Sequence, residues 1–94
     1  MKSEVLLNAS AYIVARNVTE NVCAAAINWV PTTSHLALVY EFSSVPSEDD
    51  LEHQELALTE VLAEFNDIAT AECLSCVLHV CMPETGVTVY SRSR

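Results

Sequence analysis

Two cysteines, Cys73 and Cys76, form a Cys-x-x-Cys motif, a spacing that can bind zinc or carry out thiol–disulfide exchange. The redox version of this motif lies at the start of a helix, where the helix dipole lowers the pKa of a thiol. Here the surrounding residues alternate as in a strand, and an odd separation along a strand directs two side chains to opposite faces. A second such motif and a zinc-finger histidine pair are both absent from the sequence. The pattern therefore favours cysteines packed in a core.

Other residues that could carry chemistry give weaker signals. His79 and Cys81 share one face of the same predicted strand, but two metal ligands do not complete a site without help from Cys23 or His35. No local motif singles out a nucleophilic Ser or Cys, and the presence of one Gly in the chain argues against a phosphate-binding loop. We therefore expect no enzyme activity, no metal and no cofactor.

The charge of the chain is strongly unbalanced, with 13 Asp and Glu against 4 Lys and Arg and a net charge of −9. Between Asn17 and Ser91 there is no Lys or Arg, although that stretch holds 12 of the 13 acidic residues. Such a body repels phosphates, so nucleic acids and anionic membranes are poor partners. It attracts a basic protein surface and accelerates the encounter with one. The alternative is that the acidity only keeps the protein soluble.

Length and hydropathy predict one ordered domain over residues 1–94, because 51% of the residues are hydrophobic and the chain is too short for two cores. Residues 1–20 lack the pattern of a signal peptide, and no run of 18 apolar residues could span a membrane. We therefore expect a cytoplasmic protein whose four cysteines are reduced thiols.

Hydrophobic periodicity predicts a helix, two strands and a second helix in the first two thirds of the chain. The first helix spans residues 3–15, and residues 35–42 form the clearest strand. Residues 18–30 contain both helix-forming and strand-forming segments, and we interpret them as a strand that ends in a hairpin turn at residues 31–34. The expected buried face of the first helix consists of Val5, Leu6, Ala9, Tyr12 and Ile13.

The second helix is the strongest local prediction, and it runs from Ser47 to about Phe65. Ser47 is an N-cap and Asp50 occupies the position of a capping-box acid. The acids Glu48–Asp50 therefore stabilise the first turn of a helix, which is a better explanation than a loop around a hard cation. The expected buried stripe consists of Leu51, Leu58, Val61, Leu62 and Phe65.

Two more strands complete the predicted order. Residues 72–82 are apolar on both faces, which is typical of a central strand covered on both sides. A turn at residues 83–86 and a short strand at residues 87–91 follow. The order helix, strand, strand, helix, strand, strand predicts an α+β fold in which one antiparallel sheet has two helices packed on it.

A candidate partner-binding face lies on the second helix. Leu56 is expected to face solvent among charged side chains, and one apolar anchor with a charged rim is typical of protein interfaces. Single exposed leucines are also common without any function. The predicted partner-binding residues are Glu52, His53, Leu56, Glu60, Glu64 and Asp67.

Several segments together resemble the small immunity proteins of contact-dependent growth inhibition and related bacterial toxin systems. The resemblance covers roughly residues 3–92 as a pattern, and residues 18–30, rich in Ala and Cys, depart from it. Its specific part is about residues 36–65, which hold the strand Leu36–Phe42, the capped segment Pro46–Asp50 and the helix Leu58–Phe65. The general pattern continues with a long strand and a short terminal strand that carries Val89, Tyr90 and then Arg92.

This resemblance implies a protein that binds one cognate toxin domain in the cytoplasm and neutralises it as a tight heterodimer. Many such toxins are nucleases with basic substrate grooves, over which carboxylates would stand in for phosphates. Immunity families do not share interface positions, so the resemblance assigns no site residues.

A second interpretation is an acidic adaptor or chaperone subunit for a basic secreted protein, which would bind without inhibition. The two differ in a toxicity assay, because only an immunity protein restores growth. Neither interpretation fixes the oligomeric state.

Overall fold

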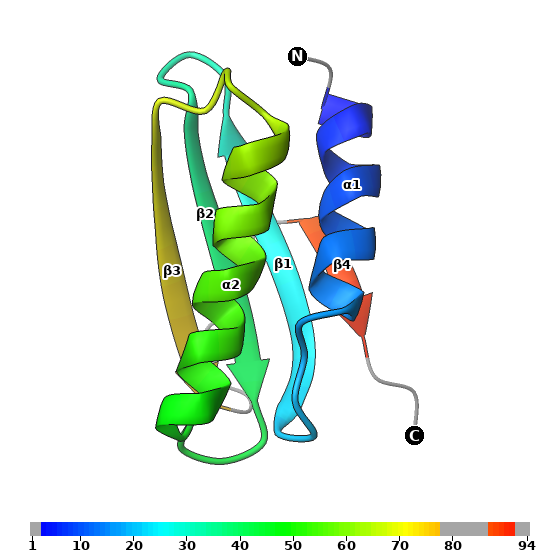
Figure 1. Cartoon of the computed structure of the whole chain (residues 1–94), viewed down its shortest axis with the longest axis vertical. Coiled ribbons are helices and arrows are strands. Elements are labelled where there is room, and N and C mark those ends of the chain that lie inside the picture. The colour runs from blue at the N-terminus through cyan, green and yellow to red at the C-terminus, as the bar shows by residue number, and fades with distance from the viewer. Residues whose placement is uncertain (1–2, 78–86, 92–94) are drawn as a thin grey trace.

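The computed structural model describes residues 3–77 and 87–91, which form two helices and four strands (Figure 1). The expected α+β order of elements is confirmed, and α1, β2, α2 and β4 have nearly the predicted bounds. The expected turn at residues 83–86, like residues 78–82 of the predicted central strand, lies outside the described residues. The elements are α1 (Ser3–Ala15), β1 (Val22–Val30), β2 (His35–Phe42), α2 (Glu48–Glu64), β3 (Thr70–Val77) and β4 (Val87–Ser91).

The strands form one mixed sheet in the order β3-β2-β1-β4. β1 is antiparallel to both of its neighbours, but β2 and β3 are parallel. The expectation of an antiparallel sheet is therefore wrong for this pair. The reason is the connection, because α2 links β2 to β3, and a strand–helix–strand crossover brings the chain back to run in the same direction.

The interpretation of the ambiguous second segment as a strand is confirmed for Val22–Val30. Its alanines lie in the middle of the sheet between β2 and β4, where Ala25 and Ala26 are buried. Burial between two strands thus outweighs the helix propensity of this Ala-rich sequence. The predicted hairpin turn at residues 31–34 is also confirmed, and Ser34 adopts a left-handed φ of 52° within it.

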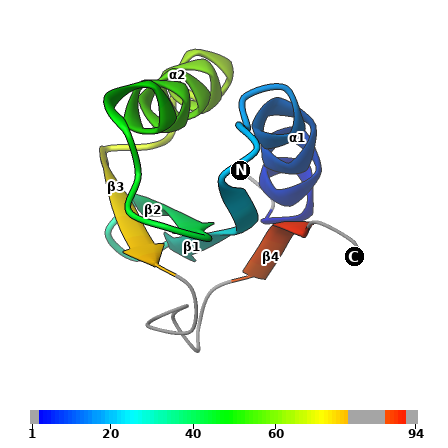
Figure 2. The same ribbon diagram turned by 90° about the horizontal axis from the view of Figure 1, so that it is seen from below.

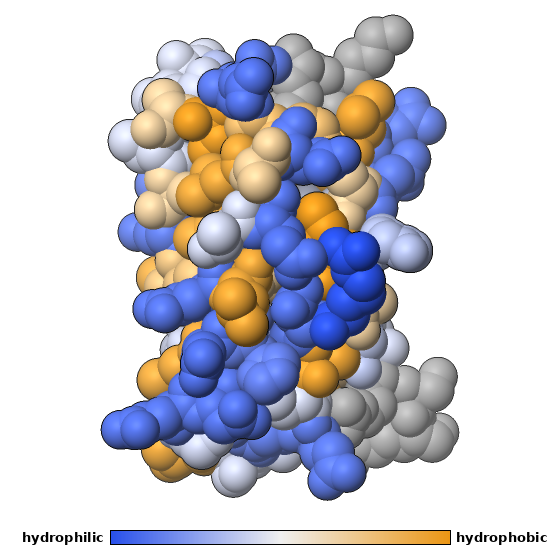
Figure 3. Space-filling view, viewed as in Figure 1, coloured by the Kyte–Doolittle hydropathy of each residue, from blue (hydrophilic) through white to orange (hydrophobic). Residues whose placement is uncertain are grey.

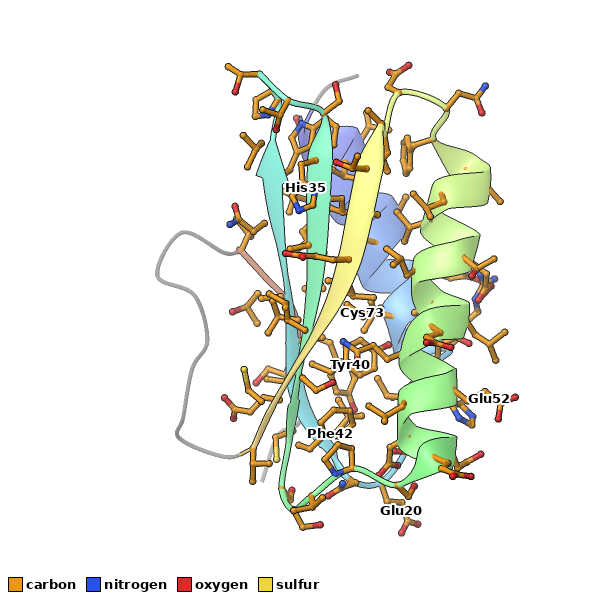
Figure 4. All side chains as sticks on the ribbon, turned by 90° about the vertical axis from the view of Figure 1, so that its left-hand side faces the viewer. Glu20, His35, Tyr40, Phe42, Glu52 and Cys73 are labelled. Atoms are coloured by element: carbon orange, nitrogen blue, oxygen red, sulfur yellow. The ribbon has the colours of Figure 1, made fainter. Side chains whose placement is uncertain are left out.

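Both helices pack on the same face of the sheet, so the molecule has two layers (Figure 2). α1 packs against β1, β4 and α2, whereas α2 packs against α1 and β3. The core between the layers contains Leu36, Leu38, Tyr40 and Phe42 of β2, and the labelled Tyr40 and Phe42 lie between the sheet and the helices in Figure 4. The Tyr40 hydroxyl donates to the carbonyl oxygen of Asn17 at 3.0 Å, and burial raises the pKa of Tyr40.

β3 is an edge strand, whereas the sequence predicted a central one. Leu74 pairs with Val39 on the face of the sheet opposite the helices and is 43% exposed. The apolar residues on both faces of this segment predicted that other elements would cover both faces. Among the described residues, no element covers the Leu74 side of β3.

The buried face of each helix is rotated from the predicted one. In α2 the buried residues are Asp50, Gln54, Ala57 and Val61, and of the predicted stripe Leu51 and Leu62 are exposed. Val61, Leu58 and Phe65 do pack in or against the core, as predicted. In α1 the predicted core residues Val5 and Tyr12 are exposed, whereas Leu6 and Ile13 are buried as predicted.

Gln54 explains the rotation of α2, because its buried amide bonds to both parallel strands. Its Nε2 donates to the carbonyl oxygens of Leu38 and Leu74 at 3.1 and 2.9 Å, and its Oε1 accepts from the Ser75 hydroxyl at 3.0 Å. A buried amide is tolerated when its donors and acceptor are satisfied in this way. A count of apolar residues cannot detect such a position.

The N-terminus of α2 has the predicted capping box. The Ser47 hydroxyl accepts from the Asp50 N–H at 3.1 Å, and Asp50 Oδ2 accepts from the Ser47 N–H at 2.9 Å. Asp50 also accepts from the Thr19 hydroxyl at 2.6 Å and from the Asn21 amide at 3.0 Å. These hydrogen bonds, that of Thr19 first, lower the pKa of Asp50 from 3.8 to about 2.

The cysteines do not all match the expectation of reduced thiols. Cys23 and Cys73 are free, but Cys76 is disulfide-bonded. The expectation of reduced thiols rested on the predicted cellular compartment. A compartment does not determine whether the fold brings two cysteine sulfur atoms close enough to bond. Neither helix of the described chain is both long and apolar enough to cross a membrane.

Candidate functional site

The six predicted partner-binding residues lie on α2 and just beyond its end. Positions 52, 56, 60 and 64 follow one another at intervals of four residues, so they form one stripe along the helix. Glu52, Leu56 and Glu64 are exposed, and the labelled Glu52 points away from the sheet in Figure 4. Asp67 lies in the connection between α2 and β3. The structure thus brings the α2 members of the set together on one side of the helix.

Leu56 is 48% exposed, as the sequence predicted. The hydropathy view shows hydrophilic side chains interspersed with smaller apolar patches over α2, and a hydrophilic cluster between the two helices (Figure 3). The stripe therefore combines one apolar side chain with acidic neighbours, which is the composition expected of an interface anchor and its rim.

His53 is engaged within the first turns of α2. Its Nδ1 lies 2.8 Å from the carbonyl oxygen of Asp49 and 3.6 Å from Asp49 Oδ1. These contacts hold the ring against the helix, so His53 flanks the stripe and does not project from it.

Glu60 has a contact role that the sequence did not suggest, because it joins the two helices. Its Oε1 accepts from Arg16 at 2.7 Å, and its Oε2 accepts from the side-chain amide of Asn17. The Arg16 guanidinium also lies over the Tyr12 ring, 4.8 Å from its centroid. Arg16 is thus held between an aromatic ring of α1 and a carboxylate of α2.

A groove of about 340 Å³ runs between α1 and α2 beside this contact. The hydrophobic pattern does not predict the contribution of α1, because it places Tyr12 on the expected buried face of that helix. The four-residue spacing of Tyr12 and Arg16, which allows a ring and a cation to stack on an exposed helix face, was the available signal. The groove is lined by Ala9, Tyr12, Ile13, Arg16, Glu60, Ala63 and Glu64.

A family model described as "MafI2 immunity protein" matches residues 3–93. The chain belongs to the MafI2 immunity protein family. No curated protein matches it closely enough to serve as a relative. Membership confirms the coarser prediction, a bacterial immunity protein with a toxin-neutralising role, and is consistent with an inhibitor that acts without catalysis.

The described surface of this MafI2 immunity protein is dominated by carboxylates. Arg16 is the one Lys or Arg within residues 3–77 and 87–91, and it is already paired. Glu48, Glu52, Glu55 and Glu64 are exposed on α2. The side of the molecule that carries the stripe is therefore acidic, and among the described Lys and Arg residues only Arg16, paired with Glu60, lies beside it.

In the described part of this family member, no group of three or more His, Cys, Asp and Glu residues could hold a metal ion. The weak ligand pair His79 and Cys81 lies outside the described residues. Cys23 and His35 were the residues that could have completed a metal site with that pair. The Cys23 sulfur lies 2.7 Å from the Ser43 hydroxyl oxygen. The His35 ring forms a hydrogen bond with the Thr70 hydroxyl and lies 3.5 Å from the Glu72 carboxylate.

Proposed function

We propose that this MafI2 immunity protein neutralises one cognate toxin domain by binding it as a tight heterodimer, without catalysing a reaction. The toxin domain is a nuclease with a basic substrate groove, and the protein acts in the cytoplasm of the toxin-producing cell and its siblings. The delivery system is of the contact-dependent growth inhibition type or a related one. The family match supports the inhibitory role, and the surface of α2 supports the chemistry of its partner.

The observation that carries the proposal is the row of exposed carboxylates on α2. Carboxylates on one rigid helix stay at fixed separations, so they can pair with cationic side chains that normally contact phosphates. Long-range attraction between the acidic body and a basic groove also raises the association rate.

Leu56 supplies the apolar element of this surface. A few anchors in the centre of an interface carry most of the binding energy, and surrounding charged residues contribute mainly to specificity and association rate. Glu52 and Glu64 lie on the stripe on either side of Leu56 and form its charged rim, with His53 and Asp67 at the margins.

Co-expression with the product of the upstream reading frame, in which we expect the toxin domain, tests the proposal. We expect restored growth, a stable complex on size-exclusion chromatography, nanomolar or tighter affinity, and loss of nuclease activity in the purified mixture. The double variant Glu52→Lys/Glu64→Lys should lose both binding and growth rescue. Glu4→Lys, at an exposed position of α1 outside the stripe, is the matched control and should keep both.

Two outcomes would contradict the proposal. If the toxin forms no complex with the protein and still kills cells that contain it, the protein does not neutralise that toxin. A stable complex without growth rescue supports instead the adaptor or chaperone interpretation, in which the protein binds a basic partner and does not inhibit it.

A further inference from the structure

Tyr12 is an aromatic residue in an unusual position for so small a protein. It lies on α1, is 67% exposed, and forms part of the wall of the groove between α1 and α2. Large aromatic side chains are normally used in the core or at interfaces, and tyrosine is among the residues most often found as an interface anchor. The exposure of Tyr12 is therefore a reason to extend the candidate interface from α2 across the groove to α1.

Apolar and charged residues together line the groove. Ala9, Ile13 and Ala63 contribute apolar atoms, Tyr12 comes from α1, Arg16 directly follows α1, and Glu60 and Glu64 come from α2. Small side chains at Ala9 and Ala63 leave room between the helices. The volume of about 340 Å³ is at the lower end of the range for binding pockets, which suits one inserted side chain better than a whole helix.

The two acidic residues of the groove differ in their contacts. Glu60 is occupied by Arg16 and by the Asn17 amide. Glu64 lies one turn further along α2, is exposed, and has no Lys or Arg partner among the described residues. Glu60 thus positions Arg16 and closes one part of the groove, whereas the Glu64 carboxylate stays available to a partner.

We propose that this groove receives a lysine or arginine side chain of the toxin domain, which pairs with Glu64 and packs against Tyr12. The inference rests on the proposed function and deepens it by naming the chemistry of the contact. Arg16 demonstrates the same recognition inside the chain, because its guanidinium is held by the Tyr12 ring at 4.8 Å and by Glu60 at 2.7 Å. The excess of carboxylates around the groove gives the charge complementarity that selects a cation over an acidic or apolar side chain.

The test measures binding of the purified full-length protein to a catalytically inactive form of the cognate toxin domain. Tyr12→Ala and Glu64→Gln should each raise Kd at least about tenfold, as expected for residues at the centre of an interface. Tyr12→Phe should stay close to wild type, because the ring and not the hydroxyl makes the contact. The effects of Tyr12→Ala and Glu64→Gln should be less than additive, because both residues contact the same inserted side chain.

Matched controls separate this site from the rest of the surface. Glu4→Gln removes the same charge from an exposed part of α1 outside the groove, and Leu74→Ala truncates an exposed apolar residue on the opposite face of the sheet. Both should leave Kd within about twofold of wild type. Thermal melts should show all five variants folded, since every substituted side chain is exposed.

The possible results distinguish the groove from the function. If the wild-type protein binds and inhibits the toxin but Tyr12→Ala and Glu64→Gln leave Kd unchanged, the groove proposal is wrong and the proposed function stands. If Leu74→Ala alone weakens binding, the interface lies on the other face of the sheet. If the wild-type protein does not bind the toxin at all, the proposed function fails first.

Discussion

Arg16, directly after the last residue of α1, and Glu60 on α2 form an ion pair of 2.7 Å that ties the end of α1 to α2. Arg16 is the one Lys or Arg within residues 3–77 and 87–91, so no other Lys or Arg in these ranges is left to pair with a carboxylate. The other carboxylates of α2 have no Lys or Arg partner among these residues. The acidic character predicted from the sequence is thus a property of the folded surface, which is what an electrostatically guided binding protein needs.

The first prediction concerns the rate of association with the cognate toxin domain. With a net charge of −9 the protein should be steered toward a basic surface, so raising NaCl from low to high concentration should lower the association rate constant by about tenfold or more. The dissociation rate constant should change much less, because it depends on short-range contacts. Stopped-flow mixing over a series of salt concentrations measures both, and an association rate that is independent of salt would refute electrostatic steering.

The second prediction concerns the link between the helices. Glu60→Gln should lower the free energy of unfolding by up to about 1 kcal/mol, because both side chains of the ion pair are about half exposed and water screens their attraction. A double-mutant cycle with Arg16→Gln isolates the pair interaction. Urea unfolding at low and high salt is the measurement, and the coupling energy should shrink as salt increases.

The sequence predicted those elements whose signals are local. The capping box joins Ser47 and Asp50, which are three positions apart, so the sequence predicts the start of α2 correctly. Apolar residues alternate along His35–Phe42, so the sequence predicts both ends of β2 correctly. The exposure of Leu56 was also found, because the helix period places it opposite Val61 and Phe65.

Features that depend on distant partners were missed. Gln54 is buried only because the carbonyl oxygens of Leu38 and Leu74 lie within its reach, and those atoms are fixed by the parallel pairing of β2 and β3. Tyr12 is exposed because α1 turns Ser10 and Val14 toward the sheet instead. The pattern therefore predicts the part of the candidate site on α2 but not the part on α1, because it places Tyr12 in the core.

The third prediction concerns Asp50 and acid stability. Hydrogen bonds from Thr19, from the Ser47 N–H and from Asn21 favour the carboxylate and lower its pKa from 3.8 to about 2. Because the pKa is lower in the folded state, this contribution is fully present above pH 4 and is lost as the pH falls through about 2. Asp50→Asn should cost about 2 kcal/mol at pH 7, the range for hydrogen bonds to a charged group.

Urea unfolding from pH 7 down to pH 2 checks this prediction. The difference in unfolding free energy between wild type and Asp50→Asn should shrink as the pH falls below 4. Asp49→Asn is the matched control at the neighbouring position, where the side chain is 72% exposed and lies outside the capping box. A difference that stays constant down to pH 2 would show that Asp50 does not titrate differently in the folded protein.

The fourth prediction concerns Ser10, whose hydroxyl is the one buried side-chain oxygen without a hydrogen-bond partner among the described residues. An unsatisfied buried polar group costs about 1–3 kcal/mol, and alanine is also the better helix former. Ser10→Ala should therefore raise the free energy of unfolding by about 1–2 kcal/mol. For a chain of this length each kcal/mol corresponds to about 4–8 °C in Tm, which differential scanning calorimetry resolves.

Asn8→Ala separates the two contributions to that gain. Asn8 is exposed on the same helix, so its replacement reports the change in helix propensity alone, about 0.5 kcal/mol. Any stabilisation by Ser10→Ala beyond that of Asn8→Ala belongs to the buried hydroxyl. A Ser10→Ala variant less stable than wild type would mean that the hydroxyl makes a favourable hydrogen bond in solution. Ser10 would then be one of the residues that hold α1 on the sheet, and therefore one that positions Tyr12 at the groove.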